Sequence, residues 1–267
     1  MEVRESFMSD SALVKVAIEA AKKAAVVIRQ NYLQNNEVYD KKPTDLMDYV
    51  TKVDKQAEEV ISRTIKELYP DHSIWGEESG KNPGKGEYTW VIDPIDGTKN
   101  FVRGLPQFVT SIGVLKNQEP VVGVIFDPID MSYVWAVKGL GAYIGERKPI
   151  SNVRVDIKSS SIAINFGKTV GQRKRTLGVF KGILEITPIV RMLGSTAYVV
   201  KGMTEGKFDA LIDTGDYWDY AAGLVIAKEA GFHVSEWNGN EVSDKSDFIF
   251  WSRNELQPIL FDILKKL

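Results

Sequence analysis

Apolar and polar positions divide the first half of the chain into two helices followed by a set of strands. Apolar residues recur at helical spacing over 9–34, with Ser9 or Ser11 as the cap, and over 54–69, where Asp54 stands at the cap position. The polar residues 35–53 between them predict a loop. Short apolar or alternating runs then predict strands at 73–75, 90–92, 109–115, 121–126, 133–137 and 142–144. We expect this half to be α+β, with helices against a large, mostly antiparallel sheet.

The second half alternates strands and helices, which is typical of a layered α/β domain. The composition becomes polar around 150–158, and we place the boundary there, between an N-terminal half at 1–150 and a C-terminal half at 151–267. Strands are predicted at 162–165, 189–193, 208–212, 233–237 and 248–251. Helices are predicted to open near the basic run 171–175, at 196 and at 218, and Asn254 is predicted to cap a last helix.

The composition excludes several classes of protein. The 267 residues are 43% apolar and 26% charged with a net charge of −2, which is typical of a soluble globular protein that binds neither nucleic acid nor anionic membrane. No apolar run approaches the ~20 residues of a membrane span, and no signal peptide is visible, so we expect a cytoplasmic protein. Cysteine is absent and only His72 and His233 are present. A metal site would therefore use acidic oxygen ligands, which suit a hard cation.

The most informative stretch is WVIDPIDGTKNF at 90–101. Its apolar start predicts a buried strand, which ends at a proline flanked by Asp93 and Asp96. Gly97 permits a sharp turn, and Thr98 adds a hydroxyl where a helix with free backbone N–H groups can begin. Carboxylates at a strand end beside N–H donors suit a divalent cation bound next to a phosphate, although Asp-Pro and Asp-Gly also form ordinary turns.

Two further segments place acidic residues in similar settings. WGEESG at 75–80 carries Glu77 and Glu78 after a short strand, and YWDYAAG at 217–223 carries Asp219 between a strand and a helix. Each acid has a structural alternative. The glutamate pair can belong to a solvated face, and Asp54 and Asp219 can be plain helix caps.

Together and in this order, the three segments resemble the signatures of the inositol monophosphatase family of lithium-sensitive, Mg²⁺-dependent phosphatases, over about residues 10–260. The resemblance implies the layered αβαβα fold of the sugar phosphatases, with the site at the junction of the two halves. It further implies two or three Mg²⁺ ions as cofactor, a small-molecule phosphate ester as substrate, inhibition by lithium, and assembly as a homodimer or a dimer of dimers.

The resemblance also assigns the metal ligands. Glu77, Asp93 and the backbone carbonyl of Ile95 would hold one ion, and Asp93, Asp96 and Asp219 would hold the second. A third ion would lie near Glu77 and Glu78 with help from Asp54. The catalytic residues would be Glu77, Thr98 and Asp54, with Glu77 and Thr98 orienting the attacking water.

The substrate-binding residues are assigned in the same way. The N–H groups of Gly97 and Thr98 would hold the phosphate, and the turn Gly194, Ser195 and Thr196 would hold substrate hydroxyls, with simple helix capping as its alternative. The remaining candidates are Asp96, Asp219, Asp213 as the polyol-binding carboxylate and Arg191 as a cation for a second phosphate. The chain departs from many relatives in its longer loop at 35–53 and in a spacing from Asp213 to Asp219 that is shorter by one residue.

The sequence therefore predicts a Mg²⁺-dependent phosphomonoesterase acting on inositol 1-phosphate. The alternative is a fructose-1,6-bisphosphatase, or one enzyme with both activities. A nucleotide 3′-phosphatase fits less well because no base-stacking motif is evident, and a non-catalytic regulatory or RNA-associated protein fits less well because buried carboxylates are costly without cations.

A second copy of the four letters DPID, at Asp127 to Asp130, lies between two predicted strands. No Gly-Thr pair follows it, so we interpret it as a surface hairpin turn. On this interpretation, Asp127→Asn and Asp130→Asn leave turnover within a few-fold and cost at most ~0.5–1 kcal/mol of stability.

Overall fold

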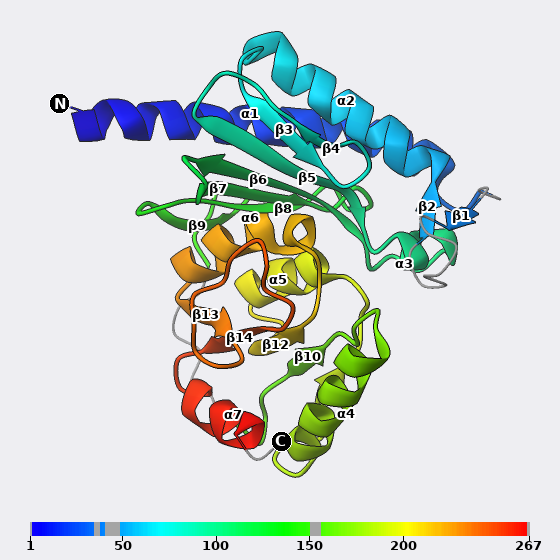
Figure 1. Cartoon of the computed structure of the whole chain (residues 1–267), viewed down its shortest axis with the longest axis vertical. Helices are drawn as coiled ribbons and strands as arrows, with labels where there is room; N and C mark the ends of the chain where they lie inside the picture. The colour runs from blue at the N-terminus through cyan, green and yellow to red at the C-terminus, as the bar shows by residue number, and fades with distance from the viewer. Residues whose placement is uncertain (1, 35–37, 41–48, 150–155, 266–267) are drawn as a thin grey trace.

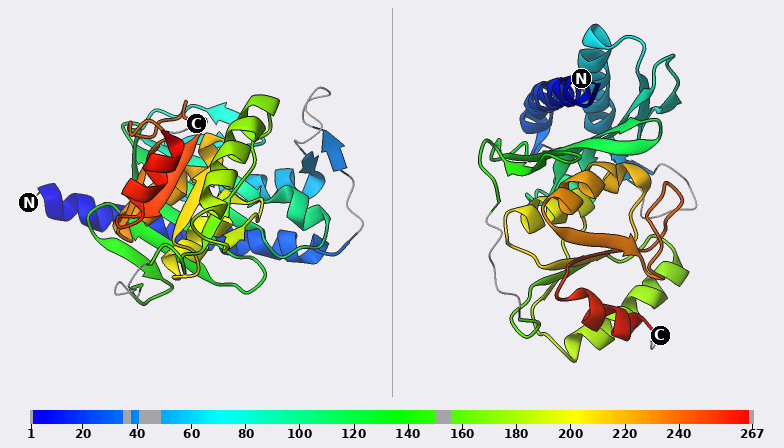
Figure 2. Two further views of the ribbon diagram at one scale, coloured as in Figure 1. Left: turned by 90° about the horizontal axis from the view of Figure 1, so that it is seen from below. Right: turned by 90° about the vertical axis from the view of Figure 1, so that its left-hand side faces the viewer.

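The computed structural model describes residues 2–34, 38–40, 49–149 and 156–265, and it builds them into five stacked layers (Figure 1). The first layer holds α1 (Glu2–Asn31) and α2 (Lys52–Leu68), the third α5 (Thr196–Thr204) and α6 (Tyr217–Glu229), and the fifth α4 (Val170–Leu184) and α7 (Gln257–Leu264). A seven-stranded and a five-stranded sheet form the layers between them. The side view in Figure 2 shows the same succession. The predicted αβαβα fold class is confirmed.

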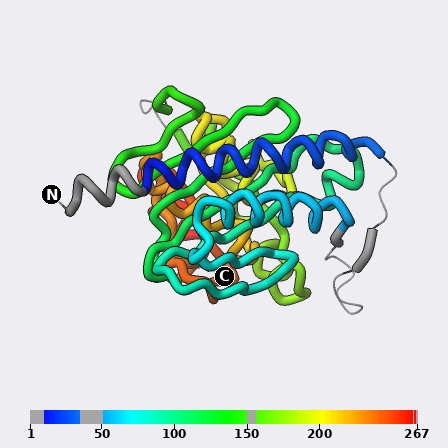
Figure 3. The backbone as a smooth tube through the Cα atoms, turned by 90° about the horizontal axis from the view of Figure 1, so that it is seen from above, coloured from blue at the N-terminus to red at the C-terminus, as the bar shows by residue number. Residues whose placement is uncertain are grey.

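The larger sheet has the order β4-β3-β5-β6-β7-β8-β9, and only the β3–β5 pair is parallel. Its strands are β3 (Ser73–Gly76), β4 (Gly80–Asn82), β5 (Tyr88–Asp96), β6 (Val109–Lys116), β7 (Glu119–Phe126), β8 (Tyr133–Val137) and β9 (Gly141–Ile144). The long helices α1 and α2 lie side by side over one face (Figure 3). The helices α5 and α6 cover the other face, so the interior strand β5 is buried on both sides and begins as a continuous apolar run.

The smaller sheet has the order β11-β10-β12-β14-β13 and is mixed, with β10 parallel to both β11 and β12. Its strands are β10 (Ile162–Ile164), β11 (Val190–Arg191), β12 (Ala210–Asp213), β13 (Phe232–Glu236) and β14 (Ile249–Arg253). A hairpin of β1 (Val38–Asp40) and β2 (Tyr49–Thr51) and the short helix α3 (Thr98–Val102) lie beside the large sheet. No helix among the described residues is long and apolar enough to cross a membrane.

The helix α6 lies between the two sheets and is buried on nearly all sides. Two glycines of the large sheet let it approach closely: a Cβ at Gly123 would lie 2.2 Å from the carbonyl oxygen of Ala222, and one at Gly113 would lie 3.0 Å from the Ala222 nitrogen. The small residues Ala221, Ala222 and Gly223 supply the matching surface. Asp219 lies in the first turn of this helix. The close packing of α6 therefore also fixes the distance of Asp219 from the large sheet.

Several predicted boundaries are wrong. The first helix begins at Glu2 rather than after Ser9 or Ser11, and the last begins at Gln257 after Leu256, so Asn254 does not cap it. Thr51, not Asp54, is the cap of α2. The predicted loop at 35–53 contains the β1–β2 hairpin, while its residues 35–37 and 41–48 lie outside the described residues. The boundary proposed at 150–158 falls partly on 150–155, which also lie outside them.

The second DPID copy forms the predicted connection between β7 and β8, but its first aspartate is not on the surface. Asp127 is 5% exposed, and its carboxylate lies 3.7 Å from the ammonium of Lys201, a buried residue of α5. Lys201 also lies 3.0 Å from Glu205 and 3.9 Å from the exposed Asp130. Burial raises the pKa of Asp127 above its ordinary value, and the hydrogen bond from the N–H of Ile129 and the charge of Lys201 offset only part of this rise. The turn is therefore an electrostatic anchor between the large sheet and α5.

The burial of Asp127 raises the loss of folding stability that we expect from Asp127→Asn. Removing one charge from a buried ion pair costs ~3–5 kcal/mol, and we expect about 3 kcal/mol because Glu205 still faces Lys201. Asp130→Asn is the matched control at the other end of the turn and should cost under about 1 kcal/mol because its side chain is 59% exposed. Urea unfolding of both variants measures the difference, and equal midpoints would contradict the buried anchor.

Candidate functional site

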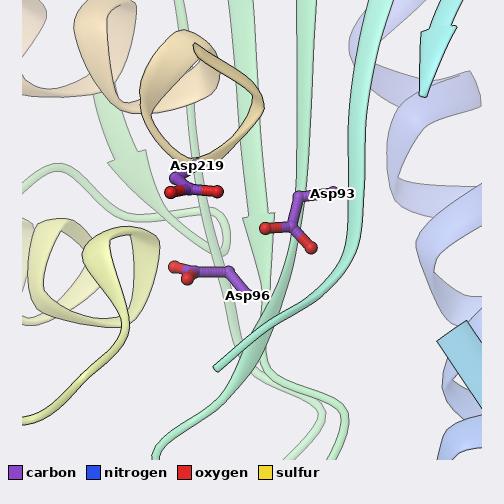
Figure 4. Close-up of side chains that lie close together, drawn as sticks. All are labelled: Asp93, Asp96 and Asp219. Carbon is purple, nitrogen blue, oxygen red and sulfur yellow. The ribbon is translucent and has the colours of Figure 1, made fainter. Parts of the chain in front are cut away.

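Three carboxylates converge at the end of β5 and the start of α6. Asp93, Asp96 and Asp219 each offer an oxygen atom within 4.8 Å of the others (Figure 4). Asp93 is 2% and Asp96 6% exposed, and Asp219 is half-buried. Asp93 and Asp96 both lie at the end of β5, whereas Asp219 lies in α6, far away in the sequence, so the fold completes this cluster.

The chain between Asp93 and Asp96 leaves the regular ladder. The pairing of β5 with β6 shifts register between these two residues, where Pro94 has no N–H to donate. The N–H of Ile95 instead donates to the carboxylate of Asp93 (2.9 Å), and the hydroxyl of Thr110 donates to the carbonyl of Pro94 (2.9 Å). With this irregularity, the carboxylates of Asp93 and Asp96 both lie close to the carboxylate of Asp219 (Figure 4).

Gly97 closes this turn in a conformation that favours glycine. Its φ is +102°, and a Cβ there would lie 2.7 Å from the carbonyl oxygen of Gln107. The side-chain amide of Asn100 bridges the carbonyls of Gln107 and Leu193, both at 2.7 Å. The turn after Asp96 is thereby tied to the segment that leads into α5.

The first turn of α5 holds Asp96 in place. The carboxylate of Asp96 accepts hydrogen bonds from the hydroxyl of Ser195 (2.8 Å) and from the backbone N–H of Ala197. Ser195 is also the cap of α5. The carboxylate therefore binds the N-terminus of a helix from the C-terminal half, where the helix dipole favours a negative charge.

Asp54 and Asp219 occupy equivalent positions in their helices. Each is the third helical residue of a capping box: Asp54 accepts from the N–H of Thr51, and Asp219 accepts from the N–H of Asp216, both at 2.8 Å. The prediction that either is the cap itself is wrong, because the caps are Thr51 and Asp216. The capping contact occupies only part of each carboxylate, so a second role remains open to both.

Asp54 is fully buried and is linked to the site through Thr98. The hydroxyl of Thr98 lies 3.0 Å from an oxygen of Asp54 and 3.0 Å from the carbonyl of Ile95. Burial raises the pKa of Asp54 to about 6, the contacts to Thr51 and Thr98 oppose this, and the charge of Glu77 adds to it. Asp54 is thus mostly ionised at neutral pH. Its carboxylate can then accept a hydrogen bond from the Thr98 hydroxyl.

The cluster opens into a small cavity of about 110 Å³. The predicted site residues that line it are Glu77, Asp93, Ile95, Asp96, Gly97, Thr98, Gly194 and Asp219. Lys99 and Lys168 also line it and were not predicted. The ammonium of Lys168 lies 2.8 Å from the carboxylate of Asp216. Lys168 follows β10, which runs parallel to β12. The carboxyl ends of parallel strands commonly bind ligands. The strand predicted at 162–165 could therefore have indicated Lys168 as a site residue.

Other predicted site residues lie away from the cavity. Glu78 lines a separate cavity beside α2, and Arg191 is exposed on the edge strand β11. Asp213 is buried and accepts hydrogen bonds from the hydroxyl of Thr196 (2.9 Å), the amide of Asn165 (3.1 Å) and the N–H of Gly215 (3.1 Å). The hydroxyls of Ser195 and Thr196, predicted to bind substrate, donate in this structure to the buried carboxylates of Asp96 and Asp213.

The electrostatics of the cluster are those of a cation site. Burial raises the pKa of Asp93 well above its ordinary value, and the charges of Glu77, Asp96 and Asp219 raise it further. Burial likewise raises the pKa of Asp219, with Asp96 and Glu77 adding to it. The pKa of Asp96 rises to about 7, although its contacts with α5 oppose the shift. Clustered carboxylates that resist ionisation become ionised when a hard cation binds, so the donor set fits Mg²⁺.

Comparisons with known proteins agree with this geometry. The sequence profile of the inositol monophosphatase family matches residues 9–263. Two relatives in the sequence comparison are similar over most of their length. "Nus factor SuhB" of Pasteurella multocida is 36% identical over 270 residues, covering 95% of this chain and 99% of that protein. "Fructose-1,6-bisphosphatase/inositol-1-monophosphatase" of Aquifex aeolicus is 34% identical over 232 residues, covering 82% and 84%.

A solved structure shows the same fold. The crystal structure of extragenic suppressor protein suhB from Bartonella henselae superposes with a TM-score of 0.89 at 27% identity, covering 96% of this chain and 99% of that one. The family resemblance read from the three sequence segments is therefore confirmed over nearly the whole chain.

The raised carboxyl pKa values predict how the metal-free protein responds to pH. A carboxyl group whose pKa is higher in the folded state binds more protons when folded, so it adds stability as the pH falls below its folded pKa. Near pH 6.5 the lowered pKa values of His72 and His233 oppose this gain, because about half of each histidine is protonated in the unfolded state, but the raised carboxyl groups of the cluster outweigh the two histidines. We expect the melting temperature in chelator to rise across this interval.

Calorimetry with and without Mg²⁺ tests this prediction. Saturating Mg²⁺ should raise the melting temperature more at pH 8 than at pH 6.5, because binding must displace protons at the lower pH. A shift of the same size at both values would show that the clustered carboxyl groups are not the ligands.

Proposed function

Because the chain belongs to the inositol monophosphatase family, we propose that it is a Mg²⁺-dependent phosphomonoesterase that hydrolyses inositol 1-phosphate to inositol and phosphate. The observation that carries the proposal is the buried cluster of Asp93, Asp96 and Asp219, which opens into a cavity beside the turn of Gly97 and Thr98. The family is generally Mg²⁺-dependent, and an acidic cluster of this kind is what such a cofactor requires.

Two ions would divide the acidic groups of the cavity between them. Glu77, Asp93 and the carbonyl of Ile95 would hold one, and Asp93, Asp96 and Asp219 would hold the other. Bound Mg²⁺ supplies an activated water and neutralises the charge that develops on the phosphoryl group and the leaving oxygen. The third ion expected near Glu78 gains less support, because Glu78 lines a different cavity.

The residues around the ions would orient the attacking water. The Asp54 carboxylate accepts a hydrogen bond from the Thr98 hydroxyl. The lone pairs of the Thr98 oxygen can then accept a hydrogen bond from water. Glu77, which also lines the cavity, would accept from the same water. Two fixed acceptors hold the oxygen in line with the ester bond and so lower the entropy that must be lost in the transition state.

The same cavity would bind the ester itself. The backbone N–H groups of Gly97 and Thr98 would donate to the phosphate, and Gly194 would approach the polyol. In our proposal, three predicted substrate-binding residues support the site and do not contact the ester: Ser195, Thr196 and Asp213. The hydroxyl of Ser195 holds the Asp96 carboxylate, and the Asp213 carboxylate holds the hydroxyl of Thr196. Arg191 is given no role in this proposal, because it is exposed on the outer strand and does not line the cavity.

A specific observation keeps fructose 1,6-bisphosphate as a second candidate substrate. A second phosphate needs cations, and Lys99 and Lys168 line the cavity. The Aquifex relative carries both activities in its name. A non-catalytic role stays as the alternative from a different class, since another relative is named a Nus factor. The complete acidic set favours an enzyme.

Activity is predicted to depend on Asp96. Asp96→Asn keeps the shape of the side chain but removes charge from a metal ligand, so phosphate release from inositol 1-phosphate should fall by about 10²-fold or more. Asp130→Asn is the matched control in the second DPID copy and should stay within a few-fold of the unchanged protein. Chelator should abolish release and lithium should inhibit it. Full turnover in excess chelator would rule out the mechanism.

The substrate choice can be tested at Lys168. Phosphate release from inositol 1-phosphate, fructose 1,6-bisphosphate and a nucleotide 3′-phosphate should be greatest for the first. If Lys168 binds a second phosphate, Lys168→Met raises KM for the bisphosphate about tenfold and leaves KM for inositol 1-phosphate within about threefold. A uniform change for both esters would remove the bisphosphate assignment of this lysine.

A further inference from the structure

The turn that carries Glu77 is held from behind by Glu58, a residue of α2 outside the site cavity. Glu58 is 3% exposed, and its two carboxylate oxygens accept hydrogen bonds from the N–H groups of Glu78 (2.8 Å) and Ser79 (2.9 Å). The N–H of Glu77 itself donates to the carbonyl of Ile92 on β5 (3.0 Å). Three successive N–H groups of the turn are thus bound to rigid elements, two of them to one carboxylate.

Gly76 provides a second sign that this contact shapes the turn. A Cβ at Gly76 would lie 2.3 Å from one oxygen of Glu58 and 2.6 Å from the other. The backbone of Gly76 is not in the left-handed region, so a side chain there would not strain the backbone but would push the Glu58 carboxylate out of its present position.

Glu58 lies four residues after Asp54, so both acids project from the same side of α2. Asp54 holds the hydroxyl of Thr98, and Glu58 holds the turn of Glu77. Apolar neighbours on that side, Val53, Ala57 and Ile61, are buried and fix the helix on the large sheet. One rigid helix therefore reaches both groups that, in the proposed function, orient the attacking water.

We propose that Glu58 is a positioning residue that sets the distance between the Glu77 carboxylate and Thr98. It touches neither ion nor ester and acts only through the turn. The inference rests on the proposed function, because it assumes that Glu77 binds metal and water. A purely structural role would instead lower stability and leave the catalytic constants of the folded protein unchanged.

Glu58→Gln tests the proposal with the least change of shape. The amide keeps one acceptor oxygen and turns an NH₂ group toward a backbone N–H, so one of the two contacts is lost. A misplacement of about 1 Å costs about 10²-fold in rate, so we expect kcat to fall about ten- to hundredfold. The Mg²⁺ concentration for half-maximal rate should rise several-fold, with KM for the ester within about threefold.

The control is Thr64→Val on the same helix. Thr64 is 5% exposed and its hydroxyl donates only within α2, to the carbonyl of Val60 (2.9 Å). This variant should lower the melting temperature without changing kcat or the Mg²⁺ requirement. Glu58→Gln with unchanged kinetic constants, or Thr64→Val with the same kinetic loss, would overturn the positioning role.

Gly76→Ala gives an independent test from the other side of the contact. The added methyl group must displace the Glu58 carboxylate, so we expect the same kinetic loss as in Glu58→Gln. In Glu58→Ala the space is free, and adding Gly76→Ala should cause little further loss. Fully additive losses in the double variant would show that the two residues do not act through one contact.

Melting in Mg²⁺ separates failure of this inference from failure of the proposed function. If the unchanged protein releases no phosphate from any ester, the proposed function fails, but the half-saturating Mg²⁺ concentration of the melting shift can still be compared. We expect that concentration to be several-fold higher in Glu58→Gln than in Thr64→Val. Equal concentrations would overturn the role of Glu58 whatever the protein catalyses.

Discussion

The structure depends on the burial of three carboxylates next to one another. Asp93, Asp96 and Asp219 offer oxygens within 4.8 Å of one another, Asp93 and Asp96 are buried and Asp219 half-buried, and their raised pKa values express the free energy that this arrangement costs. In the second DPID copy, the buried carboxylate of Asp127 has a cationic partner within the protein, because Lys201 forms an ion pair with it. Around the first copy, the charges that act most strongly on Asp93 are themselves acidic, and the three carboxylates are close enough together to hold a metal ion.

Each neighbouring element serves this cluster. The N-terminus of α5 binds Asp96, and the same helix is anchored at Lys201 to the β7–β8 turn. Close packing on Gly113 and Gly123 sets the height of α6 and hence of Asp219. On the opposite face, α2 supports Thr98 through Asp54 and the Glu77 turn through Glu58. The site thus joins both sheets, and neither half contains all of it.

Local apolar patterns predicted the α+β and α/β halves, whereas the order of the layers and the clustering of Asp219 with Asp93 and Asp96 came from the family resemblance, because no local signal joins residues so far apart. The run at 90–101 combines a buried strand with Asp, Pro and Gly, which fix its turn. The burial of Asp127 was missed because its partner Lys201 is distant in the sequence, and the position of Arg191 on the outermost strand was not predicted because strand order is not a local property. Glu58 did carry a signal: it is an acid on the apolar side of a predicted helix, one turn after Asp54.

The most direct test is a crystal structure with Mn²⁺ in place of Mg²⁺, recorded at a wavelength where manganese scatters anomalously. We predict a peak within ligand distance, about 2.0–2.3 Å, of oxygens from Asp93, Asp96 and Asp219 together, and its loss in Asp96→Asn crystals. Absence of any peak there at saturating Mn²⁺, with the three carboxylates still clustered, would contradict the account.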